Sequence, residues 1–354
     1  MQRIIFIAVS IFVGFFYQSS TAAAAPLQAI TLQLKWVHAF QFAGYYAAAA
    51  KGFYRQAGLD VTILPADPGT DVPGMVLSGA AEYGVGTSSL LLERKAGKPL
   101  VVLGVIFQHS PLVLLTAERN ATQGVHDLVD QRVMLEPQSD ELLAYLKREQ
   151  VPLSRLQLHQ HSFNPQDLID GRVDAISAYV TNERYFLDQA GFRYQTYTPR
   201  SAGIDFYGDN LFTSERELRL HPERVAAFRD ASLKGWEYAM ANPAEIIDVI
   251  LSEYPTDYSR QFLHYEAEAM VPLLRPSLIE MGYMNTGRWQ HIADTYAELG
   301  MLPADFPVET MLYQPNDRGQ LGWVYRVMGI MVLLGVLLGS GSLYIYRANR
   351  RLDR

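Results

Sequence analysis

The sequence predicts an α/β protein built from two lobes, with the second lobe inserted into the first. Strand-like and helix-like segments alternate over the first two thirds of the chain, and the remainder is mostly helical. The uncharged run 100–107 is typical of a strand that is buried on both faces. We expect lobe 1 to comprise 26–115 and 204–320, and lobe 2 to comprise 116–203. Two crossover strands would then act as a hinge, with a ligand cleft between the lobes.

The expected elements follow from hydrophobic periodicity and from Gly, Pro and Ser punctuation. The strands of the first part cover 31–36, 61–64, 83–86 and 100–107. Its first helix covers 42–50 and is followed by a short turn that Gly58 closes. A short helix then ends at Gly79, and another helix is capped by Ser88 or Ser89 and stops at Gly97.

The inserted part has its own strands at 132–135, 156–161 and 173–179. Ser139 caps a helix over 140–148, and Asn164 precedes a Pro that opens a short helix. The segment 203–213 then returns to the first part.

The last third begins with a capping box formed by Ser214 and Glu217. Pro222 and Pro243 each fit the first position of a helix. One helical face carries residues that we expect to pack together, namely Phe228, Ser232, Trp236 and Ala239.

Composition and charge narrow the function. The chain has 354 residues, 49% hydrophobic and 19% charged, which suits a globular protein. Its net charge of −7 argues against nucleic acid as the main partner. It contains no cysteine, which excludes a thiolate nucleophile, a Cys-ligated zinc, an iron–sulfur cluster and a lipoprotein anchor.

The N-terminus has the pattern of a secretory signal peptide over 1–25. Arg3 gives the positive start, 4–16 is apolar, and small residues at 22–25 offer cleavage sites. An uncleaved N-terminal anchor is the alternative, because cleavage directly before Pro26 is disfavoured. Both interpretations export the segment that follows.

A second apolar segment near the C-terminus predicts a transmembrane helix over 323–346. Residues 327–346 carry no charge and are long enough to span a bilayer, although a buried core helix is the alternative. The basic tail 347–354 would be cytoplasmic, which places the main domain in the periplasm of a bacterium, held at the inner membrane. The interfacial aromatics are Trp323, Tyr325, Tyr344 and Tyr346, and the basic residues are Arg347, Arg350, Arg351 and Arg354.

The segment 31–64 carries the strongest indication of ligand binding. Aromatic and amide side chains lie at its strand-to-helix turn, which is where open α/β sheets bind ligands. They offer flat stacking faces and a hydrogen-bonding amide, which suits a planar small molecule. Some of these aromatics are alternatively core residues, and we expect this of one of the two adjacent tyrosines. The residues are Trp36, Gln41, Phe42, Tyr45 and Tyr46.

Several short motifs, in a characteristic order, resemble the NMT1/THI5-like family of type II periplasmic binding proteins, which is related to the SsuA-like binding proteins. They include Leu34-Lys-Trp36, Gly44-Tyr-Tyr46, Lys51-Gly-Phe-Tyr54, Tyr83-Gly-Val-Gly86, Gly171-Arg-Val-Asp-Ala175 and Tyr179-Val-Thr-Asn-Glu183. The resemblance runs from about residue 32 to about residue 302. It implies a type II periplasmic-binding-protein fold around a small-molecule ligand, an aminopyrimidine-like precursor of thiamine.

By that resemblance Trp36 stacks on the ligand ring. Thr87 and Ser88, at a helix N-terminus, offer backbone N–H groups and hydroxyls to a polar substituent. Asn182, Glu183 and Asp205 are candidates for the ring nitrogens and amino group, and Tyr179 is a further candidate for ligand binding.

Two further pairs lie where the chain is expected to cross between the lobes. His109 and Ser110 follow a buried strand at the edge of the cleft. Asp205 and Tyr207 alternate with Asp209 around the second crossover, where these residues either line the cleft or hold the hinge turn. We expect no metal site, because the His159-x-His161 pair has no apparent third ligand.

Eukaryotic members of the family are enzymes that require a lysine for pyridoxal phosphate, a histidine and a Cys-rich motif. The lysine and histidine would lie in 84–92, which contains neither. We therefore expect no cofactor and no thiamine pyrimidine synthase activity. Two biological roles stay open: a membrane-anchored receptor that serves an ABC permease, and the periplasmic sensor half of a protein with a cytoplasmic cyclase or kinase domain.

Overall fold

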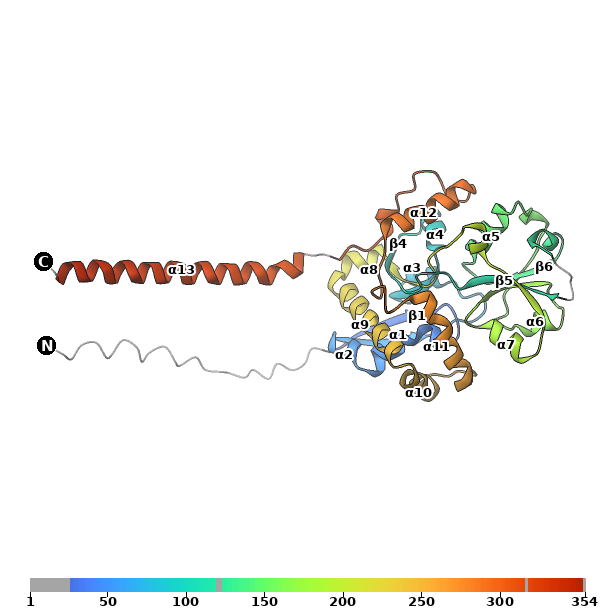
Figure 1. Ribbon diagram of the computed structural model, residues 1–354, viewed down its shortest axis with the longest axis horizontal. Coiled ribbons are helices and arrows are strands. Elements are labelled where there is room, and N and C mark those ends of the chain that lie inside the picture. Colours follow the sequence, from blue (N-terminus) through green and yellow to red (C-terminus); the bar gives the residue numbers. More distant parts are fainter. Residues whose placement is uncertain (1–25, 119–122, 316–317, 353–354) are drawn as a thin grey trace.

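The computed structural model describes residues 26–118, 123–315 and 318–352 (Figure 1). It contains two five-stranded mixed sheets, each covered by helices, and a long C-terminal helix that extends away from them. This confirms the predicted α/β class and the two-lobed architecture. The predicted signal peptide, 1–25, lies outside the described residues.

The first sheet has the strand order β2-β1-β3-β10-β4. β1 runs parallel to β2 and β3, while β10 runs antiparallel to β3 and β4. The strand that returns from the second lobe is therefore inserted near the centre of this sheet. The strands are β1 Gln28–Gln33, β2 Leu59–Leu64, β3 Tyr83–Gly86, β4 Leu100–Val105 and β10 Asn210–Ser214.

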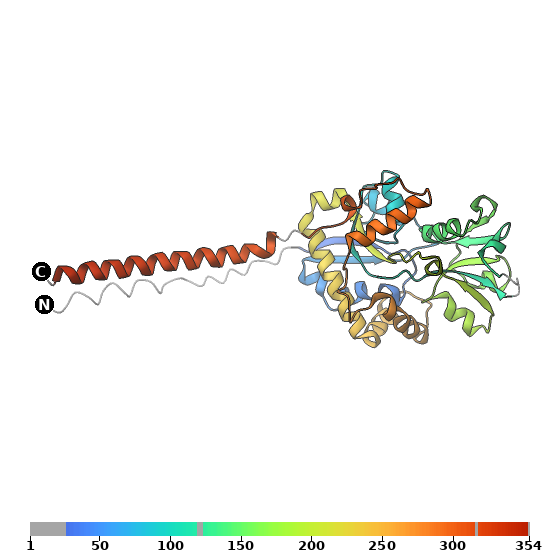
Figure 2. The same ribbon diagram turned by 45° about the horizontal axis from the view of Figure 1, so that its top comes forward.

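In the described part of the first lobe, nine α-helices lie around this sheet (Figures 1 and 2). They are α1 Ala43–Ala50, α2 Phe53–Gln56, α3 Val72–Ser78, α4 Leu90–Lys95, α8 Glu215–Leu220, α9 Pro222–Ala241, α10 Pro243–Glu253, α11 Arg260–Leu274 and α12 Thr286–Glu298. The predicted capping box is present in part, because the Ser214 side chain accepts a hydrogen bond from the Glu217 N–H. Pro222 and Pro243 begin α9 and α10 as predicted.

The second sheet has the strand order β7-β6-β8-β5-β9. β6 is parallel to β7 and β8, and β5 is antiparallel to β8 and β9. Its strands are β5 Leu112–Ala117, β6 Arg132–Leu135, β7 Gln157–Gln160, β8 Ala175–Tyr179 and β9 Tyr194–Tyr197. Its helices are α5 Asp140–Arg148, α6 Gln166–Ile169 and α7 Glu183–Gln189.

The chain passes between the sheets twice, at 106–111 and at 198–209. The first boundary expected from the sequence, at Leu115, lies inside β5, so the crossing comes a few residues earlier. We call residues 26–111 and 204–315 the first lobe and residues 112–203 the second lobe.

Close packing between α1 and α9 fixes the turn that precedes α1. Gly44 faces the indole of Trp236, and Gly235 faces the Gly44 carbonyl oxygen, so a Cβ atom at either glycine would overlap its neighbour. The helical face predicted in α9 is buried, since Phe228, Ser232 and Trp236 are each at most 1% exposed. The two glycines thus allow the helices to approach until their backbones nearly touch.

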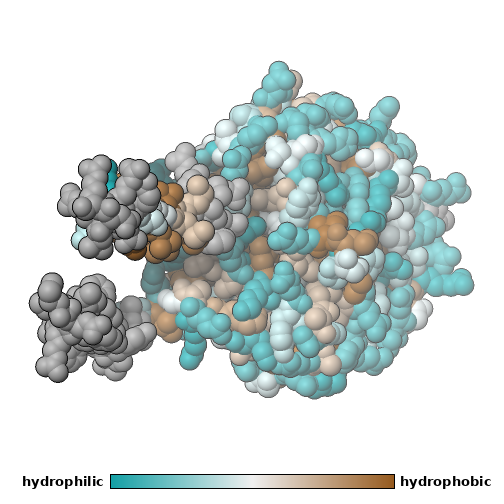
Figure 3. Space-filling model, turned by 60° about the vertical axis from the view of Figure 1, so that its left-hand side comes forward, coloured by the Kyte–Doolittle hydropathy of each residue, from teal (hydrophilic) through white to brown (hydrophobic). Residues whose placement is uncertain are grey.

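The helix α13, Arg318–Leu352, contains an apolar window over Val327–Ile345 that is long enough to cross a membrane. None of this window is buried against the lobes, and Figure 3 colours its described residues brown beside a largely teal surface. The chain before it is held at the first sheet, because the Tyr313 N–H donates to the Val102 carbonyl oxygen at 2.8 Å.

Candidate functional site

A small cavity of about 10 Å³ lies between the two lobes. Its lining comes from the segments that follow β1, β6 and β8, so it lies at the carboxyl ends of strands from both sheets. Most of the lining residues carry a polar or charged group. They are Lys35, Trp36, Gln41, Glu136, Tyr179, Asn182 and Glu183.

A buried carboxylate on the second crossover joins both lobes at this cavity. Asp209 accepts hydrogen bonds from Gln41 Nε2 at 2.6 Å and from the Tyr179 hydroxyl at 3.0 Å. Lys35 Nζ lies 3.8 Å from the same carboxylate and 4.3 Å from the centre of the Tyr179 ring. Burial raises the pKa of Asp209, while the Lys35 charge and these hydrogen bonds act in the opposite direction.

Two further carboxyl groups of the second lobe border the cavity. Glu183 Oε2 accepts a hydrogen bond from the Tyr179 N–H at 2.8 Å. Burial raises the pKa of Glu183 to about 8 and also raises the pKa of Glu136, which Lys35 opposes. Glu136 Oε1 is buried with no hydrogen-bond partner among the described residues. The cavity therefore offers an acceptor that the protein itself does not satisfy.

Trp36 closes one side of the cavity and contacts both lobes. Its Nε1 donates to the Tyr258 hydroxyl at 3.2 Å, and Asn182 Nδ2 donates to the same hydroxyl at 3.2 Å. The Trp36 ring packs against Phe163 of the second lobe, with ring centroids 3.7 Å apart. Trp36 is only 4% exposed, so its indole is held between the two lobes.

Two of the sequence candidates lie in the core instead of the cavity lining. Phe42 is fully buried, at the N-terminus of α1. Tyr45 is also fully buried, and its ring packs edge-on against Trp236 at 5.7 Å. Its neighbour Tyr46 is buried too, with its hydroxyl 2.8 Å from His38 Nδ1. We expected one core tyrosine here; the structure buries both.

The polar groups at Thr87 and Ser88 are engaged within the protein. The Thr87 N–H donates to Gln138 Oε1 at 3.1 Å, and its hydroxyl donates to the Gln138 carbonyl oxygen at 2.7 Å. The Ser88 hydroxyl donates to the Tyr207 carbonyl oxygen at 2.6 Å. Gln138 of the second lobe thus covers this helix start, and neither residue borders the cavity.

The candidates at the two crossovers form a separate charged cluster. His109 Nδ1 lies 2.9 Å from Asp205 Oδ2, and Arg200 and Arg288 lie 3.3 and 3.4 Å from the same carboxylate. Tyr207 lies under the Arg288 guanidinium, 4.4 Å from the ring centre. Arg200 belongs to the second lobe and Arg288 to the first, so the cluster ties the lobes together at the hinge.

Ser110 belongs to the same region, because its hydroxyl is beside the buried Glu141. Burial raises the pKa of Glu141 to about 8, and the Ser110 hydroxyl opposes this rise. The four crossover candidates therefore contact hinge residues and do not line the cavity.

The described residues contain no group of three potential metal ligands. His161 is buried, and its Nε2 lies 3.0 Å from the Ser177 carbonyl oxygen. His159, in contrast, is exposed in β7. The two histidines of the His-x-His pair therefore do not share one environment.

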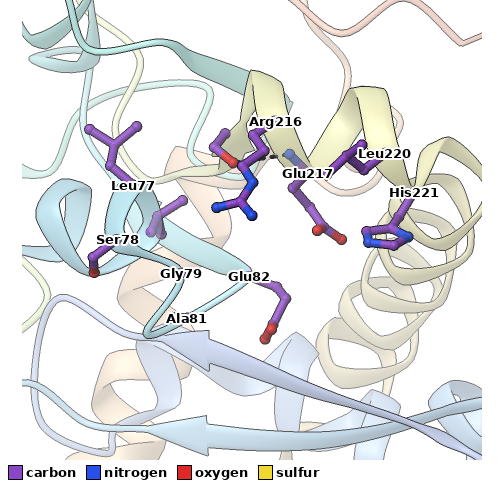
Figure 4. Close-up of a pocket in the computed structure, with 11 residues that line it drawn as sticks. Leu77, Ser78, Gly79, Ala81, Glu82, Arg216, Glu217, Leu220 and His221 are labelled. Atoms are coloured by element: carbon purple, nitrogen blue, oxygen red, sulfur yellow. Dashed lines mark hydrogen bonds between the residues drawn. The ribbon is translucent and has the colours of Figure 1, made fainter.

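A larger hollow lies outside the cleft, between α3 and α8 (Figure 4). Its two carboxylates already have partners in the protein. Glu82 accepts from the Thr31 N–H at 2.7 Å, and Glu217 accepts from Arg224 Nε at 2.7 Å and Nη2 at 2.6 Å. This hollow therefore lacks the unsatisfied acceptor found in the cavity between the lobes.

Sequence reasoning missed several residues at the site. Lys35 lies inside one of the motifs that carry the family resemblance. Its position next to Trp36 in the sequence does not indicate which way its side chain points. Glu136 directly follows a strand, as other lining residues do. Its position at a strand end could therefore have marked it as a candidate for the site. Phe163 and Tyr258 lie in loops far from the motifs, and no local pattern marks them.

Comparisons with known proteins agree with this geometry. The family model described as NMT1/THI5 like matches residues 39–246. The riboflavin-binding protein RibY of Chloroflexus aurantiacus is 25% identical over 311 residues, covering 82% of this chain and 87% of that protein. The formylaminopyrimidine-binding protein of Halalkalibacterium halodurans is 28% identical over 254 residues, covering 66% and 74%.

Solved structures of the same fold include two alkanesulfonate-type binding proteins. SsuA from Xanthomonas axonopodis pv. citri, bound to MOPS, matches with a TM-score of 0.63 and 14% identity, over 82% of this chain and 99% of that chain. SsuA from Escherichia coli matches with a TM-score of 0.57 and 15% identity, over 82% and 94%. The fold is that of periplasmic substrate-binding proteins, and the chain belongs to the NMT1/THI5-like family.

Proposed function

We propose that this protein is a periplasmic solute-binding protein whose lobes close around a planar heteroaromatic ring that bears amino groups, such as an aminopyrimidine. One observation carries the proposal. The buried Glu136 carboxyl has an oxygen without a partner among the described residues, in a cavity that Trp36 also lines. A buried acceptor of this kind favours a ligand that donates hydrogen bonds.

The surrounding groups match the two chemical features of such a ring. Trp36 offers a flat face for stacking. Glu136 and Glu183 accept hydrogen bonds when ionised, and a carboxyl that stays protonated near neutral pH can instead donate to a ring nitrogen. The raised pKa of Glu183, about 8, permits this second arrangement. Lys35 and Gln41 are held by Asp209, which keeps the lining in place.

The relatives support the same ligand class. The closed cavity, at about 10 Å³, has room for about one water molecule, so the ligand must enter while the lobes are further apart. The relatives are named for binding riboflavin and a formylaminopyrimidine, and both of those ligands contain a planar nitrogen heterocycle. We therefore favour an aminopyrimidine related to a thiamine precursor.

A thermal-shift panel tests the ligand class. Purified protein is heated with aminopyrimidines, with flavins and with alkanesulfonates, because a ligand that binds only the folded state raises the melting temperature. We expect aminopyrimidines to raise it and Trp36→Ala to abolish the rise. Phe53→Ala, a half-buried aromatic of the first lobe that packs on Tyr238, is the control. A rise with sulfonates alone would contradict the proposal.

We also propose that α13 anchors the protein in the inner membrane. Its apolar window over Val327–Ile345 is fully outside the packed lobes, and Arg347 follows it directly. An anchored receptor would deliver its ligand to an ABC permease.

A sensor role is the second candidate, and α13 favours it. The helix continues past the apolar window to Leu352, so it could transmit a change in the lobes to a cytoplasmic signalling domain. Two kinds of experiment separate these roles. Ligand-dependent uptake that requires a neighbouring permease would support transport, and a ligand-dependent change in a cytoplasmic cyclase or kinase output would support sensing.

The chain lacks the residues that a thiamine pyrimidine synthase would require. The segment after β3, Thr87 to Leu92, contains neither lysine nor histidine, and the chain contains no cysteine. Purified protein should therefore show no absorbance from a covalently held pyridoxal group.

A further inference from the structure

An aromatic contact between Trp36 and Phe163 joins the two lobes beside the cavity. The two ring centroids are 3.7 Å apart, at an interplanar angle of 36°. Trp36 belongs to the first lobe and lines the cavity, while Phe163 belongs to the second lobe and does not line it. Phe163 instead borders two larger hollows outside the cavity, both of which it shares with Tyr258. It therefore lies between the cavity and the solvent.

The backbone at Phe163 is held in a conformation that favours glycine. Its φ angle is 62°, a left-handed conformation that bulky residues rarely adopt. The Phe163 N–H donates to His161 Nδ1 at 3.0 Å, and His161 Nε2 lies 3.0 Å from the Ser177 carbonyl oxygen. Nε2 therefore carries the His161 proton. Burial also lowers the pKa of His161 to about 4, so the ring stays neutral and keeps Nδ1 as an acceptor.

Tyr258 completes the closure beside this ring. Its hydroxyl accepts from Trp36 of the first lobe and from Asn182 of the second lobe, each at 3.2 Å. An opening between the cavity and the outer hollows would therefore require Phe163 to move, or these two hydrogen bonds to break.

We infer that Phe163 sets the size of ligand that the protein accepts. The closed cavity has room for about one water molecule, so a bound ring holds the lobes further apart. The Phe163 ring, packed on Trp36, occupies the space that a fused, multi-ring ligand would need. Removing the side chain would join the cavity to the outer hollows and admit the larger ring system. This inference rests on the proposed function, because it assigns ligand selectivity to the same cleft.

Two probes of different size test the inference on the full-length protein in detergent. Dissociation constants for a formylaminopyrimidine and for riboflavin are measured with wild type, Phe163→Ala and Phe163→Gly. Both variants lack the ring, and glycine also relaxes the positive φ angle. A shared effect of the two variants therefore comes from the ring and not from backbone strain. Phe53→Ala is the matched control, and melting temperatures show that each variant is folded.

We expect wild type to prefer the aminopyrimidine, and both Phe163 variants to shift the affinity ratio toward riboflavin by about tenfold or more. A ratio that changes by less than about a factor of two would overturn the inference while leaving the proposed function intact. A wild type that prefers riboflavin would overturn it as well. Failure of wild type and variants to bind either probe would contradict both proposals.

Discussion

The Tyr179 hydroxyl of the second lobe donates a hydrogen bond to Asp209 on the return crossover, at 3.0 Å. Both groups are buried, and Asp209 also holds Gln41 and Lys35 of the first lobe. This bond is therefore one of the points at which closure of the lobes is coupled to the lining of the cavity.

Tyr179→Phe should loosen the closed form of the ligand-free protein. The variant removes one buried hydrogen bond between the second lobe and the crossover, worth about 1 kcal/mol, and leaves the ring packing unchanged. The chain has no cysteine, so spin labels on Asp60→Cys and Gln189→Cys report the distance between the lobes. We expect a longer and broader distance distribution in the variant. A distribution equal to that of wild type would show that this bond does not hold the lobes closed.

The stability of the protein should fall as the pH rises from mildly acidic to slightly alkaline values. Burial raises the pKa of Glu183 from 4.5 to about 8, so the folded state binds more protons than the unfolded state between these values. The free energy of unfolding must then decrease with pH over this window. Glu141 and Glu266, raised in the same way to about 8, add to the effect.

Glu183→Gln removes one of these groups and should flatten the decrease. The measurement is the melting temperature as a function of pH, for wild type and variant, without ligand. An unchanged slope in the variant would show that Glu183 ionises in the folded state at its ordinary pKa.

Gly44→Ala should destabilise the first lobe by roughly 1–3 kcal/mol, because the new methyl group would overlap the Trp236 indole. Chemical denaturation measures the change. Gly124→Ala is the control, since its nearest neighbour lies 4.0 Å from the added atom and its φ angle, −162°, suits alanine. Equal stability of the two variants would argue against a tight contact between α1 and α9.

Full-length protein should fractionate with membranes, and two charges in α13 should release it. Leu333→Arg with Leu337→Arg adds a cost of roughly 2.5–3.5 kcal/mol per residue near the centre of a bilayer. Leu278→Arg, at a residue of the first lobe that is 78% exposed, is the matched control. Retention of the double variant in washed membranes would contradict anchoring by α13.

Local sequence signals predicted much of the fold. The strands Tyr83–Gly86 and Arg132–Leu135 and the helix Asp140–Arg148 have the predicted bounds. Each is bounded by a glycine, a charged turn or a serine at the N-cap position, and each has a clear apolar pattern. Ser139 does not cap α5 as predicted, because its hydroxyl donates to the Glu136 carbonyl oxygen. The first lobe boundary was displaced because the apolar run 100–107 and the strand β5 follow one another with only a short polar break.

The candidate site could be predicted only in part, because the cavity combines segments that are far apart in the sequence. Of the proposed ligand-binding residues, Trp36, Gln41, Tyr179, Asn182 and Glu183 line the cavity, and their role in binding stays a prediction. Tyr45 lies in α1, on the face that packs against Trp236 of α9, whereas Trp36 lies in the loop after β1.

The remaining differences depend on contacts between segments that are far apart in the sequence. The Thr87 hydroxyl donates to Gln138 of the second lobe, and the Ser88 hydroxyl donates to Tyr207 of the first lobe. Asp209 is the carboxylate that joins the two lobes at the cavity, whereas Asp205 pairs with Arg288 and Arg200 at the hinge. No local pattern distinguishes these two aspartates.

Titration calorimetry of the full-length protein with a formylaminopyrimidine, in wild type and in Glu136→Gln, tests the central claim most directly. In the part of the chain that the structure describes, Glu136 Oε1 is buried at the cavity without a hydrogen-bond partner, and glutamine replaces one carboxyl oxygen with an NH2 donor while preserving the shape of the side chain. We predict binding of one ligand per chain in wild type and a loss of affinity of about tenfold or more in the variant. Absence of binding in wild type, or equal affinity in the two proteins, would contradict the account.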